Sequence, residues 1–220
     1  MHSTVYIGTA AAAYLLGSIP TGFLAGKARG IDIRQAGSGN IGATNVFRIL
    51  GKTAGLLVLF GDAFKGFAAC RWLPPLAAAI GQPGVPASAG SLEPLAVLAG
   101  LFAILGHVFT LWLRFKGGKG IATTAGVLAA LTPGSCLMVV GLWLVTLLLT
   151  RYVSVASMAA AVGLPFIVWG TGGGVQLIAL VTTVSLLALY KHKSNFLRLL
   201  GGTENRFQWS KRAPSTTPKS

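Results

Sequence analysis

The sequence predicts an all-α integral membrane protein with seven transmembrane helices, its N-terminus outside and its C-terminus in the cytoplasm. Of the 220 residues, 53% are hydrophobic and only 10% are charged, against about 25% charged in an average soluble domain. The apolar residues form long runs, and most of the 18 Lys and Arg lie between these runs. This composition excludes an ordinary soluble domain. Basic residues set between apolar runs indicate a membrane face and an anionic lipid or substrate, not nucleic acid.

Six apolar runs supply the helices, because a membrane crossing needs about 20 mostly apolar residues. The fourth run contains Thr132-Pro133-Gly134, a turn signal that splits it into two helices. With this split the chain has seven crossings, and without it six. The runs are 4–25, 53–80, 92–113, 121–150, 152–169 and 175–190.

Charge decides between seven and six crossings, because cytoplasmic loops are enriched in Lys and Arg. The segments that hold 16 of the 18 basic residues are 27–52, 114–119, residue 151 and 191–220. The connections that hold none are 81–91 and 170–174. Only an odd number of helices places both Arg114 and Arg151 on the cytoplasmic side, so we expect seven.

Residues 1–205 are expected to form the transmembrane domain, and residues 206–220 a basic, disordered cytoplasmic tail rich in Pro, Ser and Thr. No Lys or Arg precedes the first run, which favours a retained first span over a cleaved signal peptide. Lys65 lies within the second run and follows Asp62 by three residues. This spacing predicts a structural ion pair that faces the interior of the bundle.

No cofactor and no metal are expected. Cys70 and Cys136 both lie in apolar runs, so neither a disulfide framework nor a reactive thiol is predicted. The three histidines lack the spacing of a zinc or di-iron site. His107, inside the third run, fits equally well a hydrogen bond to a neighbouring helix and a role beside the second motif described below.

The first polar, glycine-rich segment covers residues 37–48 and reads GSGNIGATNVFR. Glycine backbone N–H groups can approach an anion closely, small hydroxyls and amides supply neutral hydrogen bonds, and arginine matches phosphate with a planar fork. An ordinary capped loop is the alternative. The candidate binding residues are Ser38, Gly39, Asn40, Thr44, Asn45 and Arg48.

The second segment covers residues 115–124, reads FKGGKGIATT, and runs from a glycine loop directly into a helix. Unpaired N–H groups at the helix start and the Lys119 amine predict a phosphate seat that includes Gly117, Gly118 and Gly120. The spacing is not that of a P-loop, so nucleotide hydrolysis is not predicted. A basic loop that merely follows the positive-inside rule is the alternative.

The third segment begins at residue 190, and its His192 and Asn195 are three residues apart, so they share one face of a helix. Neighbouring cations favour a neutral imidazole at His192. Glu204 is the only carboxylate of this C-terminal region. We expect it to be a structural clamp.

Two glycine-plus-cation loops on one membrane face predict two phosphates bound side by side, and a substrate that is part anion and part hydrocarbon. Ser154 and Ser157, just after Arg151, can cap a helix or add a phosphate contact. No Gly-x-Ser-x-Gly elbow occurs, which argues against a serine acyl-enzyme, and no His-x-x-x-x-Asp box occurs either. Catalysis is therefore expected mainly from positioning and electrostatic stabilisation.

These segments, with Gly61-Asp62-Ala63-Phe64-Lys65-Gly66 and Gly106-His107, resemble the bacterial acyl-phosphate:glycerol-3-phosphate acyltransferase family over residues 16–204. The resemblance implies an enzyme of the bacterial inner membrane with seven spans and its motifs at the cytoplasmic face. The implied reaction transfers a fatty acyl group from acyl phosphate to the sn-1 hydroxyl of glycerol 3-phosphate, which gives lysophosphatidate and inorganic phosphate as the first step of phospholipid synthesis. The implied partners are both substrates, membrane lipids and, functionally, the enzyme that makes acyl phosphate.

The same resemblance implies roles for individual residues. Ser38 and Arg48 match an essential serine and arginine, and Lys119 with its glycines matches the site that holds acyl phosphate. His192 and Asn195 match a catalytic pair, while Glu204 matches a glutamate with a structural role. Ser157 is preferred to Ser154 as the serine of the pocket. Thr110 departs from the family, which commonly has proline there.

The expected mechanism is direct attack of the glycerol hydroxyl on the acyl carbonyl. Arg48, Lys119 and His192 would hold the phosphates, while Ser38 and Asn195 orient the hydroxyl or the developing oxyanion. The proton acceptor stays open between His192 and the phosphate of the donor, as do chain-length preference and oligomeric state. The rival function is a transporter of an organophosphate or other anion, against which the lack of an evident inverted repeat argues.

Overall fold

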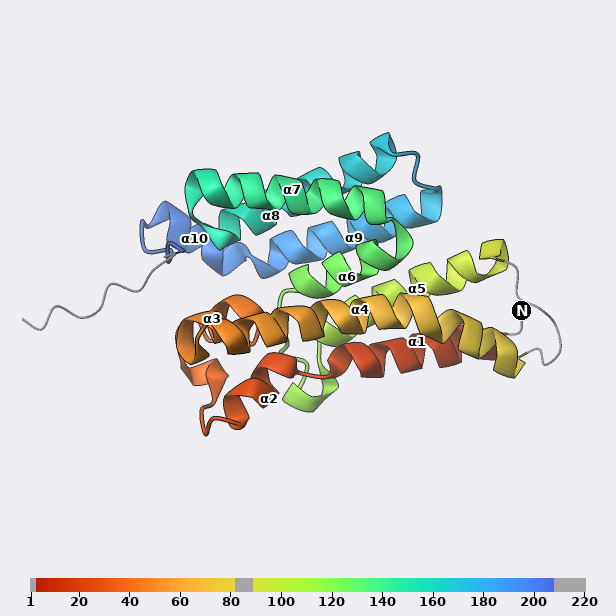
Figure 1. Ribbon diagram of the computed structural model, residues 1–220, viewed down its shortest axis with the longest axis horizontal. Helices are drawn as coiled ribbons and strands as arrows, with labels where there is room; N and C mark the ends of the chain where they lie inside the picture. The colour runs from red at the N-terminus through yellow and green to blue at the C-terminus, as the bar shows by residue number, and fades with distance from the viewer. Residues whose placement is uncertain (1–2, 82–88, 208–220) are drawn as a thin grey trace, which may run out of the picture.

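The computed structural model describes residues 3–81 and 89–207, which form a bundle of helices (Figure 1). Within these two ranges, helices and short 3-10 turns follow one another without a strand. The elements are α1 (Ser3–Ser18), α2 (Thr21–Lys27), η1 (Ile33–Gln35), α3 (Ala43–Leu50), α4 (Lys52–Gly81), α5 (Ala89–Val108), η2 (Leu111–Leu113), α6 (Ile121–Leu131), α7 (Pro133–Thr150), α8 (Val153–Gly170), α9 (Val175–Lys191) and α10 (Lys193–Leu200).

Five helical segments in the described ranges are long and apolar enough to cross a membrane, and α9 with α10, bent by 49°, supplies a sixth if the pair is one span. The predicted interruption of the fourth run is confirmed, because α6 ends at Leu131 and α7 begins at Pro133. Proline has no N–H to continue a helix but is well suited to begin one. α6 has 11 residues, so at about 1.5 Å per residue it extends about half way through a hydrocarbon core of about 30 Å.

Large apolar side chains cover the outside of the bundle. α7 is the clearest case, because only 17% of its apolar window is buried and Leu137, Leu148 and Leu149 are largely exposed. A continuous apolar surface of this extent is stable against lipid tails and unstable against water. The chain is therefore a multi-pass integral membrane protein.

The first apolar run, 4–25, was predicted as one continuous span. In the structure it is broken at Pro20, between α1 and α2. Two side chains donate hydrogen bonds to carbonyls at the break: Lys65 Nζ to Ile19 (2.9 Å) and Thr110 Oγ1 to Ser18 (2.5 Å). An unpaired carbonyl in hydrocarbon costs several kcal/mol, so these bonds stabilise the break. A proline in place of Thr110 could not make the second bond.

Glycines let two helix pairs pack closely. A Cβ added to Gly106 of α5 would lie 2.2 Å from the Tyr14 carbonyl oxygen of α1. A Cβ added to Gly126 of α6 would lie 1.8 Å from the Ala63 carbonyl oxygen of α4. Backbones this close exclude any larger residue and hold α5 and α6, which flank the second motif, in fixed positions.

One end of the bundle gathers the polar elements. Figure 1 shows α2, α3, α10 and the turn between α7 and α8 at this end, away from the turn that joins α8 to α9. Arg48 on α3, Arg151 in the α7–α8 turn and Arg198 on α10 all belong to it. These three arginines, which were expected on one membrane side, thus lie at one end of the structure.

The ordered chain continues past the domain boundary expected at residue 205. Arg206 Nε donates a hydrogen bond to the Tyr152 hydroxyl (3.0 Å), and the Phe207 N–H donates one to the Arg151 carbonyl (2.7 Å). The Phe207 ring also lies 5.7 Å from the Phe47 ring between centroids. Arg206 and Phe207 therefore contact the helical part of the chain, and residues 208–220 of the expected tail lie outside the described residues.

Candidate active site

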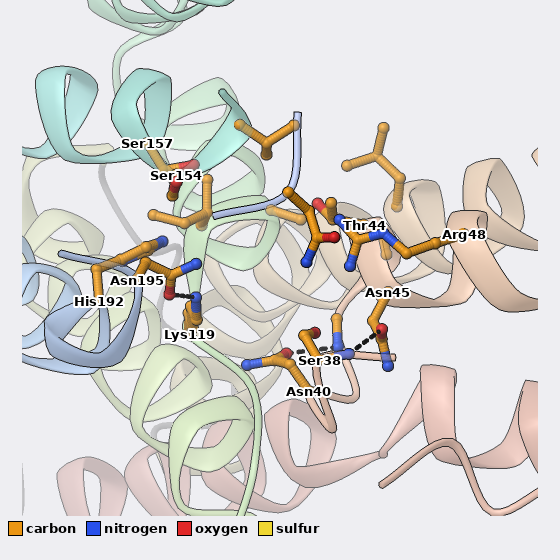
Figure 2. Close-up of a pocket in the computed structure, with 18 of the residues that line it drawn as sticks. Ser38, Asn40, Thr44, Asn45, Arg48, Lys119, Ser154, Ser157, His192 and Asn195 are labelled. Carbon is orange, nitrogen blue, oxygen red and sulfur yellow. Dashed lines mark hydrogen bonds between the residues drawn. The ribbon is translucent and has the colours of Figure 1, made fainter. Parts of the chain in front are cut away.

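A polar cavity of about 150 Å³ lies at the basic end of the bundle, with α3 and its preceding loop on one side and α8 and α10 on the other (Figure 2). All three motifs contribute to its lining. The residues that were singled out from the sequence and that line it are Ser38, Asn40, Thr44, Asn45, Arg48, Asp62, His107, Lys119, Gly120, Ser154, Ser157, His192, Asn195 and Glu204. Those outside the lining are Gly39, Lys65, Gly117 and Gly118.

Asn45 holds the first motif in shape. Its side-chain oxygen accepts a hydrogen bond from the Ser38 N–H (2.9 Å), and its amide nitrogen donates to the carbonyls of Ile33 (3.2 Å) and Ala36 (2.9 Å). Asn45 is 2% exposed, so these bonds satisfy a buried amide. Gly39 was expected to bind substrate directly. It lies outside the lining of the cavity and, with φ +71°, makes a left-handed turn in the same loop.

Arg48 extends from α3 toward the centre of the cavity, on the same helix as Thr44 (Figure 2). The guanidiniums of Arg34 and Arg198 are each paired with a carboxylate at 2.7 Å. No carboxylate of the described residues pairs with Arg48. Its planar fork therefore remains available to a phosphate from outside the protein.

Lys119 enters the cavity from the loop between η2 and α6. Its Nζ donates a hydrogen bond to the side-chain oxygen of Asn195, across from the second motif to the third (Figure 2). Burial lowers the pKa of Lys119 to about 8, although Glu204 opposes this effect while Arg198 adds to it. Lys119 is therefore mostly charged near neutral pH, and it loses its charge at a pH only slightly above neutral.

Gly117 and Gly118 shape the Lys119 loop. The N–H of Gly117 donates to the Val108 carbonyl and that of Gly118 to the His107 carbonyl, both at 3.1 Å. These two N–H groups are thus paired within the protein. Gly120, with φ +85°, makes the left-handed turn into α6, whose first residue, Ile121, lines the cavity.

His192 lies at the bend between α9 and α10. Its Nδ1 is 2.8 Å from the Ala188 carbonyl oxygen, and because a carbonyl only accepts, Nδ1 carries the proton and Nε2 presents a lone pair. Burial, followed by the charge of Lys119, lowers the pKa of His192 to about 4. The neutral imidazole expected from the neighbouring cations agrees with this geometry.

Glu204 fixes the orientation of Asn195. Asn195 Nδ2 donates to Glu204 Oε1 and Arg198 Nε donates to Oε2, both at 2.7 Å. Burial raises the pKa of Glu204, but the hydrogen bonds from Asn195 and Arg198 and the charge of Arg198 outweigh it, so the pKa is lowered. An amide whose nitrogen is bound by a carboxylate must turn its oxygen toward Lys119, and so Glu204, Asn195 and Lys119 form one chain of hydrogen bonds.

Ser154 and Ser157 both line the cavity from α8, so the structure includes both candidates. Ser157 Oγ accepts a hydrogen bond from Trp143 Nε1 on α7 (3.2 Å). The sequence offered no signal for Trp143, which is one aromatic residue within an apolar helix. Within residues 3–81 and 89–207, no group of three His, Cys, Asp or Glu side chains could hold a metal ion.

An apolar groove of about 450 Å³ continues from the polar cavity into the membrane part of the bundle. Leu59, Ile121, Ala122 and Trp143 belong to the lining of both, so the two spaces adjoin each other. Most of the other groove residues are aliphatic, and they come from α4, α6, α7, α8 and α9. The site therefore combines a cationic end with an apolar end.

The ion pair predicted within α4 is present, with Lys65 Nζ 2.8 Å from Asp62 Oδ1. A third member was not predicted: His107 Nδ1 of α5 lies 3.4 Å from the same oxygen. Spacing along one helix could reveal the first pair, whereas the approach of α5 to α4 has no local sequence signal.

Comparisons with known proteins agree with this geometry. The family model described as glycerol-3-phosphate acyltransferase matches residues 7–202. A glycerol-3-phosphate acyltransferase of Geotalea daltonii is 46% identical over 196 residues, which cover 89% of this chain and 94% of the relative. One of Thermosynechococcus vestitus is 42% identical over 211 residues, with 94% and 97% covered.

Two solved structures have the same fold. Both are of PlsY (YgiH), described as an integral membrane glycerol 3-phosphate acyltransferase. The glycerol 3-phosphate form has a TM-score of 0.80 and 38% identity and covers 92% of this chain and 96% of that one. The lysophosphatidic acid form has a TM-score of 0.78 and 37% identity, with 92% and 95% covered. The chain belongs to the glycerol-3-phosphate acyltransferase family of integral membrane proteins, the PlsY family.

Proposed function

We propose that the protein transfers a fatty acyl group from acyl phosphate to the sn-1 hydroxyl of glycerol 3-phosphate in phospholipid synthesis. The observation that carries the proposal is the union of a cationic cavity with an apolar groove. Arg48 and Lys119 supply charge for two phosphates, and the groove accommodates an acyl chain. The solved relatives are described in glycerol 3-phosphate and lysophosphatidic acid forms, which supports the acceptor and the product.

In the proposed reaction, the glycerol hydroxyl oxygen forms a bond to the acyl carbonyl carbon. The bond between that carbon and the phosphate oxygen breaks, and the hydroxyl proton passes to the leaving phosphate. The products are lysophosphatidate and inorganic phosphate. Arg48 and Lys119 stabilise the phosphate charges, and Ser38 and Asn195 lie where they can orient the hydroxyl or the oxyanion.

The geometry favours a change in the role expected for His192. A neutral imidazole whose Nδ1–H is bound to Ala188 has no N–H left to donate to a phosphate. Its free Nε2 can accept a hydrogen bond from the attacking hydroxyl. A pKa of about 4 makes it a weak base, which supports a positioning role at the hydroxyl and transfer of the proton to the donor phosphate.

We also propose the topology expected from charge: seven membrane segments, N-terminus outside, and the cavity at the cytoplasmic face of the bacterial inner membrane. In this arrangement α6 is a short fourth segment that begins at the cavity. The basic end of the bundle supports this orientation. The enzyme that makes acyl phosphate would then deliver its product from the same side.

The test is release of inorganic phosphate by the purified protein in detergent, given palmitoyl phosphate with and without glycerol 3-phosphate. We expect release that depends on glycerol 3-phosphate, is lost in Arg48→Ala, and is retained in Arg29→Ala, an exposed arginine outside the cavity. Acyl transfer in detergent, where no compartments exist, excludes transport as the sole function. No release by folded protein would refute the proposal.

A further inference from the structure

A buried cluster of polar and charged side chains is centred on Asp62 of α4, at the wall of the cavity. Its Oδ1 accepts a hydrogen bond from Thr21 Oγ1 (2.6 Å), and it lies 2.8 Å from Lys65 Nζ and 3.4 Å from His107 Nδ1. Asp62, Lys65 and His107 are each at most 5% exposed. Because these side chains are almost fully buried, the charge of Asp62 is compensated mainly by its neighbours in the cluster. His107 Nδ1 lies beside the carboxylate without forming a hydrogen bond.

The members of this cluster face different parts of the molecule. Lys65 balances the charge of Asp62 and donates to the Ile19 carbonyl at the break between α1 and α2, outside the lining of the cavity. Asp62 and His107 belong to that lining. The ion pair therefore helps to stabilise the helix break, and His107 is the member of the cluster that lies toward the second motif.

His107 supports the glycine loop at the residue before Lys119. A Cβ added to Gly118 would lie 2.2 Å from His107 Nε2 and 2.9 Å from its Cε1, so the ring is in contact with this glycine. The Gly118 N–H also donates to the His107 carbonyl. One residue thus fixes Gly118 through both its backbone and its ring.

We propose that His107, held in place by Asp62, is a positioning residue that sets the Lys119 loop against Asn195. The ring edge at Nδ1 meets the Asp62 carboxylate, and the opposite edge carries Gly118. His107 acts through the loop, so we do not assign it a bond to a reacting atom. This inference rests on the proposed function, because it assigns Lys119 to the phosphate of a substrate.

The variant His107→Asn separates the two edges of the ring. The asparagine amide retains a donor for Asp62 but lacks the edge that supports Gly118. Gly118→Ala adds a methyl group where the ring lies. The His107 ring and the added methyl group would occupy the same space. The double variant His107→Asn/Gly118→Ala should therefore restore the packing against the loop, which each single variant disturbs.

We expect His107→Asn to raise the KM of the same phosphate substrate whose KM rises in Lys119→Ala, by about 10- to 100-fold, because a misplacement of about 1 Å can reduce a rate about 100-fold. Gly118→Ala should lose at least as much, and the double variant should recover about 10-fold relative to it. Thr9→Val, which alters a buried hydroxyl of α1 outside the cavity, is the control and should match the parent.

Three results would overturn the inference: a parent-like His107→Asn, a loss confined to the KM of the other substrate, or a double variant no better than Gly118→Ala. If Gly118→Ala does not fold, recovery of folded protein in the double variant supports the inference, and the KM comparison of His107→Asn still decides it. Binding of inorganic phosphate, measured by calorimetry on the same variants, repeats the cycle without turnover. A parent that binds phosphate with the expected cycle but transfers no acyl group refutes the proposed function alone.

Discussion

Filling the apolar groove should shorten the acyl chain that the enzyme accepts. Ala125 of α6 lines the groove and is only partly buried, so Ala125→Phe adds a ring to the groove without breaking a helix contact of the kind made by Gly126. The change lies below Ile121 and Ala122, where groove and cavity meet. The phosphate end of the site should remain unchanged.

The size of the effect follows from the hydrocarbon that the ring displaces. Each buried methylene contributes about 0.8 kcal/mol, so exclusion of about four of them costs about 3 kcal/mol, or about 150-fold in kcat/KM for a long chain. A chain short enough to end before the ring should lose almost nothing. The variant should therefore lower kcat/KM more strongly as the acyl chain becomes longer, and it should leave kcat/KM for the shortest substrate unchanged.

The assay is phosphate release from a series of acyl phosphates of about 8 to about 18 carbons. Across this series the loss should grow by about 0.8 kcal/mol for each methylene that the ring excludes from the groove. The ratio of variant to parent at each length removes the partition of substrate into detergent, which is common to both. Ala129→Phe, an exposed site one turn along α6 and outside the groove, is the control. An equal loss at every chain length would refute the assignment of the groove to the acyl chain.

Three further outcomes are expected. Glu204→Gln keeps an oxygen for Asn195 and should retain most activity, whereas Glu204→Ala leaves the amide unpaired and should lose kcat/KM by about 1–3 kcal/mol, measured by phosphate release. Because the pKa of Lys119 is lowered to about 8, kcat/KM should fall as pH rises through that value and the cation is lost; a pH profile in which Lys119→Arg leaves this fall in place contradicts the assignment. Thr110→Val should destabilise the protein in thermal unfolding by about 1–3 kcal/mol, since the Ser18 carbonyl loses its donor, while Thr110→Ser should unfold like the parent.

Local sequence signals predicted the features that arise within one element. Pro133 marked the end of one helix and the start of the next because proline lacks an N–H, and α6 and α7 meet there. The spacing of Asp62 and Lys65 on one helical face gave the ion pair that the structure contains. The family motifs identified most of the cavity lining, since each motif is a continuous segment of the chain.

Features that depend on contacts between distant elements had no such signal. Pro20 interrupts the first apolar run, but the side chains that make this break stable come from α4 and from the segment after α5. His107 was left open between two roles because its neighbours, Asp62 and Gly118, belong to a different helix and a returning loop. Gly117 and Gly118 were included in the predicted phosphate seat, and no sequence signal indicated that their N–H groups are bound to carbonyls at the end of α5.

The continuity of the polar cavity and the apolar groove has a consequence for how the rate is controlled. Under the proposed function, the two reactants of the enzyme would reach the site from different phases. The concentration of one is counted per volume of water, and that of the other per area of bilayer. Turnover should then follow the mole fraction of the lipid-like reactant among surrounding amphiphiles, and added inert detergent should slow the reaction at fixed total concentration. The enzyme would thus respond to the two-dimensional crowding of its donor, which links phospholipid production to the composition of the membrane in which it sits.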